Sequence, residues 1–258
     1  LIGGVKRIAS VSQIIVPFMA IIYFIFAIIL ILFNIKEVPA AFVTIVTAAF
    51  TPKAVTGGIV GSILVAMQKG IARGIFSNEA GLGSAPIAAA AAQTNSPVRQ
   101  GLVSMTGTFI DTIIICNLTG LSIVITGAWK VEGLEGVAVT DYAFQTGLPF
   151  ANHICSFILM LALVFFAFTT ILGWDYYSER CLEYLSGGKM HYVKAFRWIY
   201  ILAVFIGPYM TVSAVWTIAD IFNGLMAIPN MIALFALSGV VAKETKQFFD
   251  NKENFKKK

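Results

Sequence analysis

Long apolar runs without charge constrain this chain more than any other feature of its sequence. No Asp, Glu, Lys or Arg occurs between Arg7 and Lys36, and residues 14–33 are apolar almost throughout. About 20 residues of helix cross the roughly 30 Å of hydrocarbon in a bilayer, so this run is long enough to span it. Only 12% of the 258 residues are charged, about half the share found in soluble domains. The sequence therefore predicts an all-α integral membrane protein.

Five further apolar segments extend this prediction to about six transmembrane helices in a single domain, residues 1–258. The stretch 39–70, after the first span, contains two prolines and several glycines, and we expect a loop with short interfacial helices there. The second span is interrupted in its middle, whereas the others are continuous. The five segments are 68–93, 101–129, 152–174, 198–212 and 219–242.

Basic residues indicate which loops lie in the cytoplasm. They precede the first span, follow the second, fourth and sixth spans, and fill the tail 243–258, whereas the segment 130–141 has one Lys and three acidic residues. Short cytoplasmic loops accumulate Lys and Arg, so this pattern predicts an even number of spans in the cell (inner) membrane and a cytoplasmic basic tail. The net charge of +5 is explained by these ends and does not indicate a nucleic-acid partner.

The interruption of the second span is the most informative part of the sequence. Glu79, Gly81, Gly83 and Pro86 occur within ten residues, between an apolar segment and an alanine-rich one. Lipid cannot satisfy unpaired backbone groups, so unwound backbone at this depth must be enclosed by protein or line an aqueous cavity. We therefore expect a polar ligand at the break.

Each end of the break offers polar groups of a different kind. The upstream half-helix should end near Phe76 and present free carbonyls, together with Ser77, Asn78 and Glu79, to an ammonium group or a small cation. The downstream half-helix should begin near residue 85, with Ser84 as its N-cap, and direct the positive end of its dipole towards a carboxylate. A zwitterionic amino acid matches both ends, and the glycines favour a small one.

A structural interpretation of the break is also open, namely a kinked helix in which Glu79 pairs with a basic residue such as Arg73 or one in a missing segment. A carboxylate near mid-membrane costs about 2.5 to 3.5 kcal/mol on insertion scales, which favours a functional role. An intramembrane enzyme would need a nucleophile with a base or a cluster of carboxylates, and the sequence indicates neither. The three scattered cysteines form neither a disulfide nor a zinc pattern.

Polar residues in other spans are weaker candidates. Asp111 and Asn117 in the third span are possible cation ligands or interhelical hydrogen-bonding groups. The hydroxyls of Thr169 and Thr170 could ligate sodium or bond back to their own helix. Trp174, taken alone, is typical of an interfacial aromatic belt.

Several motifs of this chain resemble the alanine or glycine:cation symporter family of prokaryotes. The most specific runs are GIFSNEAGLGSAPIAAA at 74–90 and PVRQG at 97–101. Further matches are VPFMA at 16–20, GWDYY at 173–177 and ADIFNGLMAIPN at 219–230, so the resemblance covers essentially the whole chain.

This resemblance implies a LeuT-type fold of two inverted five-helix repeats, with a site between the broken first helix of each repeat. The chain would then be the C-terminal portion of such a carrier, with the second repeat present and the N-terminal repeat missing. The implied sodium ligands are Thr169 and Thr170, and Asp111 is a weaker metal candidate. The implied substrate-binding residues are Phe76, Ser77, Asn78, Glu79, Gly81, Gly83, Thr170 and Trp174.

The function implied is symport of alanine, glycine or a similar small neutral amino acid into the cell by alternating access. Sodium would be the coupling ion, with no other cofactor, and the partners would be the amino acid, the lipid bilayer and the missing N-terminal helices. Three alternatives remain open: an inactive fragment of such a carrier, a related carrier that uses protons or another small zwitterion, and a channel.

Overall fold

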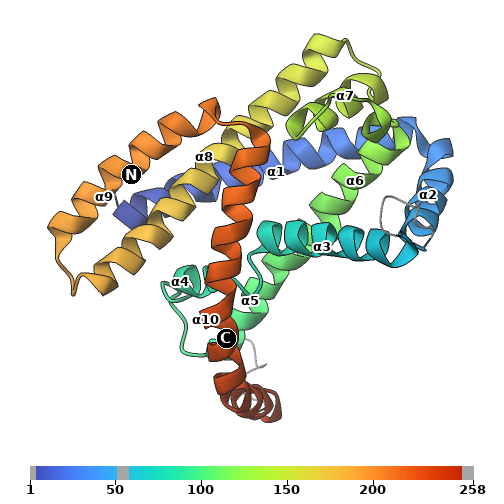
Figure 1. Ribbon diagram of the computed structural model, residues 1–258. Coiled ribbons are helices and arrows are strands. Elements are labelled where there is room, and N and C mark those ends of the chain that lie inside the picture. Colours follow the sequence, from blue (N-terminus) through green and yellow to red (C-terminus); the bar gives the residue numbers. More distant parts are fainter. Residues whose placement is uncertain (1–3, 51–57, 252–258) are drawn as a thin grey trace. The chain divides into compact units, whose positions relative to one another are not determined.

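The structure is a computed structural model that describes residues 4–50 and 58–251 (Figure 1). Within these ranges every regular element is helical, which confirms the all-α class. Three short 3₁₀ turns and a π-helical segment, η2 (Ile110–Ile115), accompany the α-helices. The α-helices are α1 (Gly4–Phe33), α2 (Val38–Phe50), α3 (Gly58–Asn78), α4 (Ala85–Ala89), α5 (Pro97–Phe109), α6 (Cys116–Ile125), α7 (Val137–Gly147), α8 (Asn152–Leu185), α9 (Met190–Ile206) and α10 (Val212–Asp250).

Four helical stretches of the described chain are long and apolar enough to cross a membrane. They coincide with the first, third, fourth and sixth predicted spans and are Val11–Phe33, Pro97–Ile125, Asn152–Leu185 and Val212–Asp250. The third of the predicted spans is built from α5, η2 and α6 in direct succession. The total of six spans and the LeuT-type arrangement of repeats stay predictions.

Several predicted boundaries are wrong. The stretch 39–70 was expected to be a loop with short interfacial helices; it does contain a short helix, α2 (Val38–Phe50), but its last part belongs to the 21-residue helix α3. Pro39 is tolerated because it lies in the first turn of α2, where no helical N–H is required. Helix α8 continues to Leu185, well beyond residue 174, and α9 begins at Met190. Charged side chains can extend a transmembrane helix into the aqueous phase, so hydropathy alone underestimates its length.

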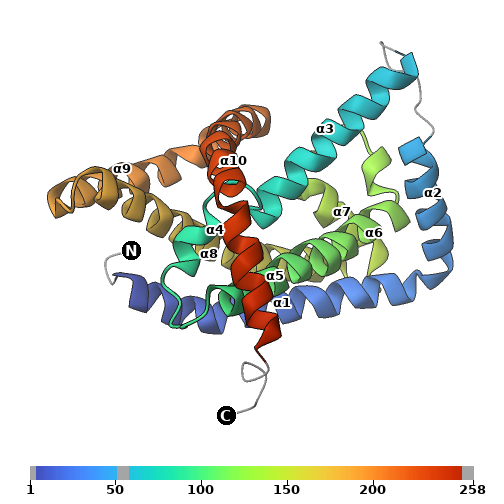
Figure 2. The same ribbon diagram turned by 90° about the horizontal axis from the view of Figure 1, so that it is seen from below.

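The chain divides into two compact units, of which the first comprises residues 1–68 and 114–215. In this unit α1 packs on α6, α7 and α8, and α8 packs on α9 in an antiparallel pair (Figure 1). Helix α2 continues from α1 at a sharp angle (Figure 2). Asn34 stabilises this corner because its side-chain amide donates hydrogen bonds to the carbonyls of Leu30 and Gly147, both at 2.8 Å.

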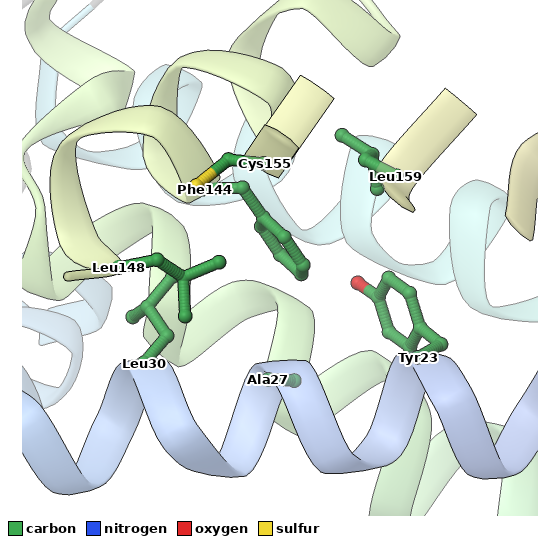
Figure 3. Packing of buried hydrophobic residues seen from close by; sticks show 7 residues of the cluster. All are labelled: Tyr23, Ala27, Leu30, Phe144, Leu148, Cys155 and Leu159. Carbon is green, nitrogen blue, oxygen red and sulfur yellow. The ribbon is translucent and has the colours of Figure 1, made fainter. Parts of the chain in front are cut away.

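The core of the first unit is a small apolar cluster between α1, α7 and α8. Figure 3 shows the α1 side chains directed towards those of the other two helices. The spacing of the α1 members is that of one helical face, and the rings of Tyr23 and Phe144 stack at 5.7 Å. The buried members are Tyr23, Ala27, Leu30, Phe144, Leu148, Cys155 and Leu159.

The second unit comprises residues 69–113 and 216–258. Its described part contains the last turns of α3, the segment after them, α4, α5 and most of α10. Helix α5 begins at Pro97 because Ser96 caps it, accepting a hydrogen bond from the backbone N–H of Arg99 at 3.3 Å. In the described residues of this unit only Leu82 and Ser84 are buried. Both lie in the segment between α3 and α4.

Gly147 provides a test of the first unit's core. A Cβ atom at this position would lie 2.7 Å from Cγ of Leu30 and 2.9 Å from Cγ2 of Thr126. We expect Gly147→Ala to destabilise the protein by about 1–3 kcal/mol, as overpacking does, and to lower its thermal midpoint in detergent. The control is Gly120→Ala in α6, which meets nothing within 4 Å and should be neutral or stabilise by about 0.5–1 kcal/mol. Equal midpoints for the two variants would contradict this packing.

Candidate functional site

The helix break lies where the sequence predicts it. Helix α3 ends at Asn78, α4 begins at Ala85, and residues 79–84 are not helical. Gly81 and Gly83 have φ angles of 82° and 85°, which glycine adopts without the steric cost that a Cβ imposes. Glu79 has a φ of 57° and is the one non-glycine residue of the described chain with positive φ. That conformation costs roughly 1–2 kcal/mol, so the surroundings of Glu79 must compensate for it.

Hydrogen bonds within the break supply part of this compensation. The N–H of Ala80 donates to Oδ1 of Asn78 at 2.9 Å, and the N–H of Leu82 donates to the carbonyl of Glu79 at 3.2 Å. The buried hydroxyl of Ser84 donates to Oε2 of Glu79 at 2.7 Å. The break is therefore an ordered turn that holds the Glu79 carboxylate in place.

The downstream half-helix differs from the expected one in two respects. Ser84 occupies the predicted N-cap position of α4, but its backbone is helical and its hydroxyl bonds to Glu79 instead of to a backbone N–H of α4. Helix α4 spans only Ala85–Ala89, and a helix this short has a weak dipole. Polar residues that compete with the helical backbone follow from Gln93 to Ser96, before Pro97. The predicted attraction of a substrate carboxylate to this helix end is consequently weak.

A second carboxylate lies beside the upstream end of the break. The hydroxyl of Ser77 donates to Oδ2 of Asp111 at 2.7 Å, and the amide of Asn78 donates to Oγ1 of Thr112 at 3.3 Å. Asp111 and Thr112 belong to the π-helical segment η2, a type of distortion that occurs frequently at functional sites. The structure thus brings Asp111 together with the predicted break residues.

Helix α10 approaches the break at Asn230. A Cβ atom on Gly83 would lie 3.2 Å from the side-chain atoms of Asn230, which is half-buried. The preceding residue, Pro229, has no N–H and therefore leaves the carbonyl of Leu225 without its usual helical donor. We assigned no function to Asn230 from the sequence, although a Pro-Asn pair inside an apolar span was the available signal.

The kinked-helix alternative proposed that Arg73 pairs with Glu79, but the structure shows a different partner for Arg73. It forms an ion pair with Asp220 of α10, and its guanidinium lies over the ring of Trp216. The Trp216 ring also contacts Phe76, with ring centroids 5.0 Å apart. Arg73, Trp216 and Asp220 were not identified as site residues from the sequence, because their contacts join segments far apart in the chain.

The remaining predicted site residues belong to α8, in the first unit. The hydroxyl of Thr169 donates to the carbonyls of Phe165 and Phe166 at 3.0 and 3.1 Å, which agrees with the interpretation that it bonds back to its own helix. Its oxygen retains lone pairs for a cation. Thr170 is exposed, and Trp174 contacts Tyr177 edge to face. The association of Thr170 and Trp174 with the break stays a prediction.

Comparison with known proteins identifies related sequences along the whole chain. The family model for the sodium:alanine symporter family matches residues 1–258. A protein of Haemophilus influenzae named an uncharacterized transporter is 56% identical over 250 residues, which are 96% of this chain and 54% of that protein. The sodium/alanine symporter AgcS of Methanococcus maripaludis is 46% identical over 257 residues, 98% of this chain and 55% of AgcS.

A third relative is the sodium/proton-dependent alanine carrier protein of Bacillus sp. It is 36% identical over 251 residues, which cover 91% of this chain and 55% of the carrier. This chain thus spans about half the length of the curated relatives that it matches.

Gly83 tests the geometry of the break. We expect Gly83→Ala to lower the thermal midpoint, because the new Cβ adds roughly 1–2 kcal/mol of left-handed strain and crowds the Asn230 side chain at 3.2 Å. The matched control is Gly74→Ala in α3, where a Cβ meets nothing within 4 Å. Alanine is the better helix former by about 0.5–1 kcal/mol, so this control should be neutral or stabilising. A Gly83→Ala variant as stable as the control would show that the break adopts another conformation.

Proposed function

This chain belongs to the sodium:alanine symporter family, and on that premise we propose that it acts in sodium-coupled uptake of a small neutral amino acid by alternating access. The family and the names of its relatives identify a transporter and not an enzyme. The single observation that carries the proposal is the ordered helix break at residues 79–84, with two carboxylates beside it.

The upstream side of the break has the chemistry to bind an ammonium group. The last carbonyls of α3 have no continuing helix to bond to, and the Glu79 carboxylate is held next to them by Ser84. Asp111 adds a second carboxylate through its contact with Ser77. Hydrogen bonds to charged groups contribute about 1.5–3 kcal/mol each, so these groups can select an amino acid by its amino end.

The break also favours a small substrate. Gly81 and Gly83 place no side chains in it, and the left-handed backbone of each disfavours any larger residue. We assign Trp174 and Thr170 of α8 to the wall that faces the substrate side chain, as the resemblance implies. The relatives named for alanine support a substrate of this size.

Sodium is the proposed coupling ion, with Thr169 and Thr170 as ligands. One sodium ion that crosses about 100 mV releases roughly 2.3 kcal/mol, which corresponds to about forty-fold accumulation of substrate. A sodium concentration gradient adds to this driving force.

Proton coupling is the second candidate, and the presence of a carboxylate in the break and of another at the end of α3 favours it. Asp111 accepts a hydrogen bond from Ser77 in the last turn of α3, and Glu79 accepts one from Ser84 within the break. One relative is named a sodium/proton-dependent alanine carrier. The experiments below separate the two coupling ions.

The proposed setting is the cell membrane, with the basic tail 243–258 in the cytoplasm. The Lys residues that follow the last predicted span support this orientation. We further propose that helices of an N-terminal repeat supply the other wall of the site, in accordance with the LeuT-type arrangement.

Replacement of sodium tests the coupling directly. In proteoliposomes that contain the complete carrier, exchange of external sodium for choline should reduce alanine uptake to background, because substrate accumulation then has no driving ion. Uptake of radiolabelled alanine is the measurement, at equal pH on both sides. Unchanged uptake would reject sodium coupling, and uptake restored by an inward pH gradient would establish the proton as the alternative ion.

Glu79 tests the binding chemistry. We expect Glu79→Gln to reduce kcat/KM for alanine by about 10- to 100-fold, the range that corresponds to loss of a charged hydrogen bond. The matched control is Glu132→Gln, in an exposed segment between η3 (Ala128–Lys130) and α7, which should leave uptake unchanged. Both variants should insert into the membrane in parental amounts. Parental kinetics for Glu79→Gln would remove Glu79 from the site.

A further inference from the structure

Four side chains from two helices form a cluster next to the break. Arg73 and Phe76 come from α3, and Trp216 and Asp220 come from α10. Residues three and four apart share a helix face, so each helix presents one aromatic ring and one charged group on the same side. Phe76 lies in the last turn of α3, directly before the break begins at Glu79.

The Trp216 ring is at the centre of this cluster. The guanidinium carbon of Arg73 lies 3.9 Å from the centroid of the Trp216 ring and 5.9 Å from that of Phe76. Trp is the strongest cation–π partner among the aromatic residues. Arg73 also forms an ion pair with Asp220, one helical turn after Trp216. Two residues of α10 thus hold Arg73: the Trp216 ring by the cation–π contact and Asp220 by the ion pair.

Contact with Trp216 restricts the Phe76 ring. The two rings meet at an interplanar angle of 67° with centroids 5.0 Å apart, an edge-to-face geometry that aromatic pairs prefer. Phe76 is otherwise exposed, with 37% of its surface accessible. Without Trp216 the ring would lose this neighbour and could occupy other rotamers.

We propose that Trp216, held by Arg73 and Asp220, positions Phe76 at the break and thereby limits the size of the substrate side chain. This inference rests on the proposed function, in which Phe76 lines the substrate site. It adds a positioning residue from α10. The substrate class stays the small neutral amino acids of the proposed function.

The competing explanation is a purely structural contact between α3 and α10. Loss of such a contact would reduce uptake of every amino acid by the same factor, because it acts on the amount of folded carrier. Loss of a positioning contact changes the ratio between large and small substrates. Selectivity therefore distinguishes the two roles.

The experiment measures uptake of alanine, valine and leucine by the complete carrier in proteoliposomes. Trp216→Ala should raise the ratio of kcat/KM for leucine to that for alanine by up to about tenfold, the effect that loss of one aromatic pair can produce. Trp216→Phe retains a ring beside Phe76 and should keep this ratio close to parental. The control is Trp198→Ala in α9, since the Trp198 side chain is 72% exposed; its ratio should not change.

The outcomes separate this inference from the proposed function. A parental carrier that transports no amino acid would overturn both. Parental transport with the same leucine-to-alanine ratio in Trp216→Ala would overturn the inference alone, and so would an equal loss for all three substrates. A raised ratio in Trp216→Ala that Trp216→Phe reverses would support it.

Discussion

Backbone polar groups inside a bilayer have no water to bond to, and this constraint explains most of what is informative in the chain. A continuous helix satisfies these groups internally, and the long apolar helices follow from that requirement. Where α3 ends at Asn78, the next residues need other partners. The break provides them through the side chain of Asn78 and the carbonyl of Glu79, and the hydroxyl of Ser84 bonds to the Glu79 carboxylate.

The same constraint links the break to function. A membrane protein bears the cost of a left-handed Glu79 and of intramembrane carboxylates only where surrounding groups compensate for it. Asp111, which accepts a hydrogen bond from Ser77 at the end of α3, lies in η2, where the third predicted span is π-helical. Helix α10 contributes Asn230, which lies beside Gly83 and directly follows Pro229 of the same helix. Three irregular backbone segments thus converge within the second unit, where we propose that a zwitterionic amino acid binds.

The sequence predicted the features that depend on local chemistry. Apolar runs specify membrane helices because length and hydropathy are sufficient for that inference, and Glu79, Gly81, Gly83 and Pro86 together located the break. Features that depend on contacts between distant segments were missed. The partner of Arg73 lies 147 residues away, and Ser84 bonds to Glu79 instead of capping α4 because the turn brings the two side chains together. The predicted second span extends to residue 93, whereas α4 ends at Ala89, shortly before the polar residues that precede Pro97.

Chemical accessibility of the break tests the central claim most directly. In a carrier from which Cys116, Cys155 and Cys181 have been removed, a single cysteine replaces Ala80, which is exposed within the break. The measurement is the rate at which a membrane-impermeant thiol reagent modifies Ala80→Cys, with and without alanine and sodium. Our account predicts modification at a measurable rate and protection when alanine and sodium are present together. A cysteine that never reacts, or one whose reaction rate is the same with and without the amino acid, would contradict it.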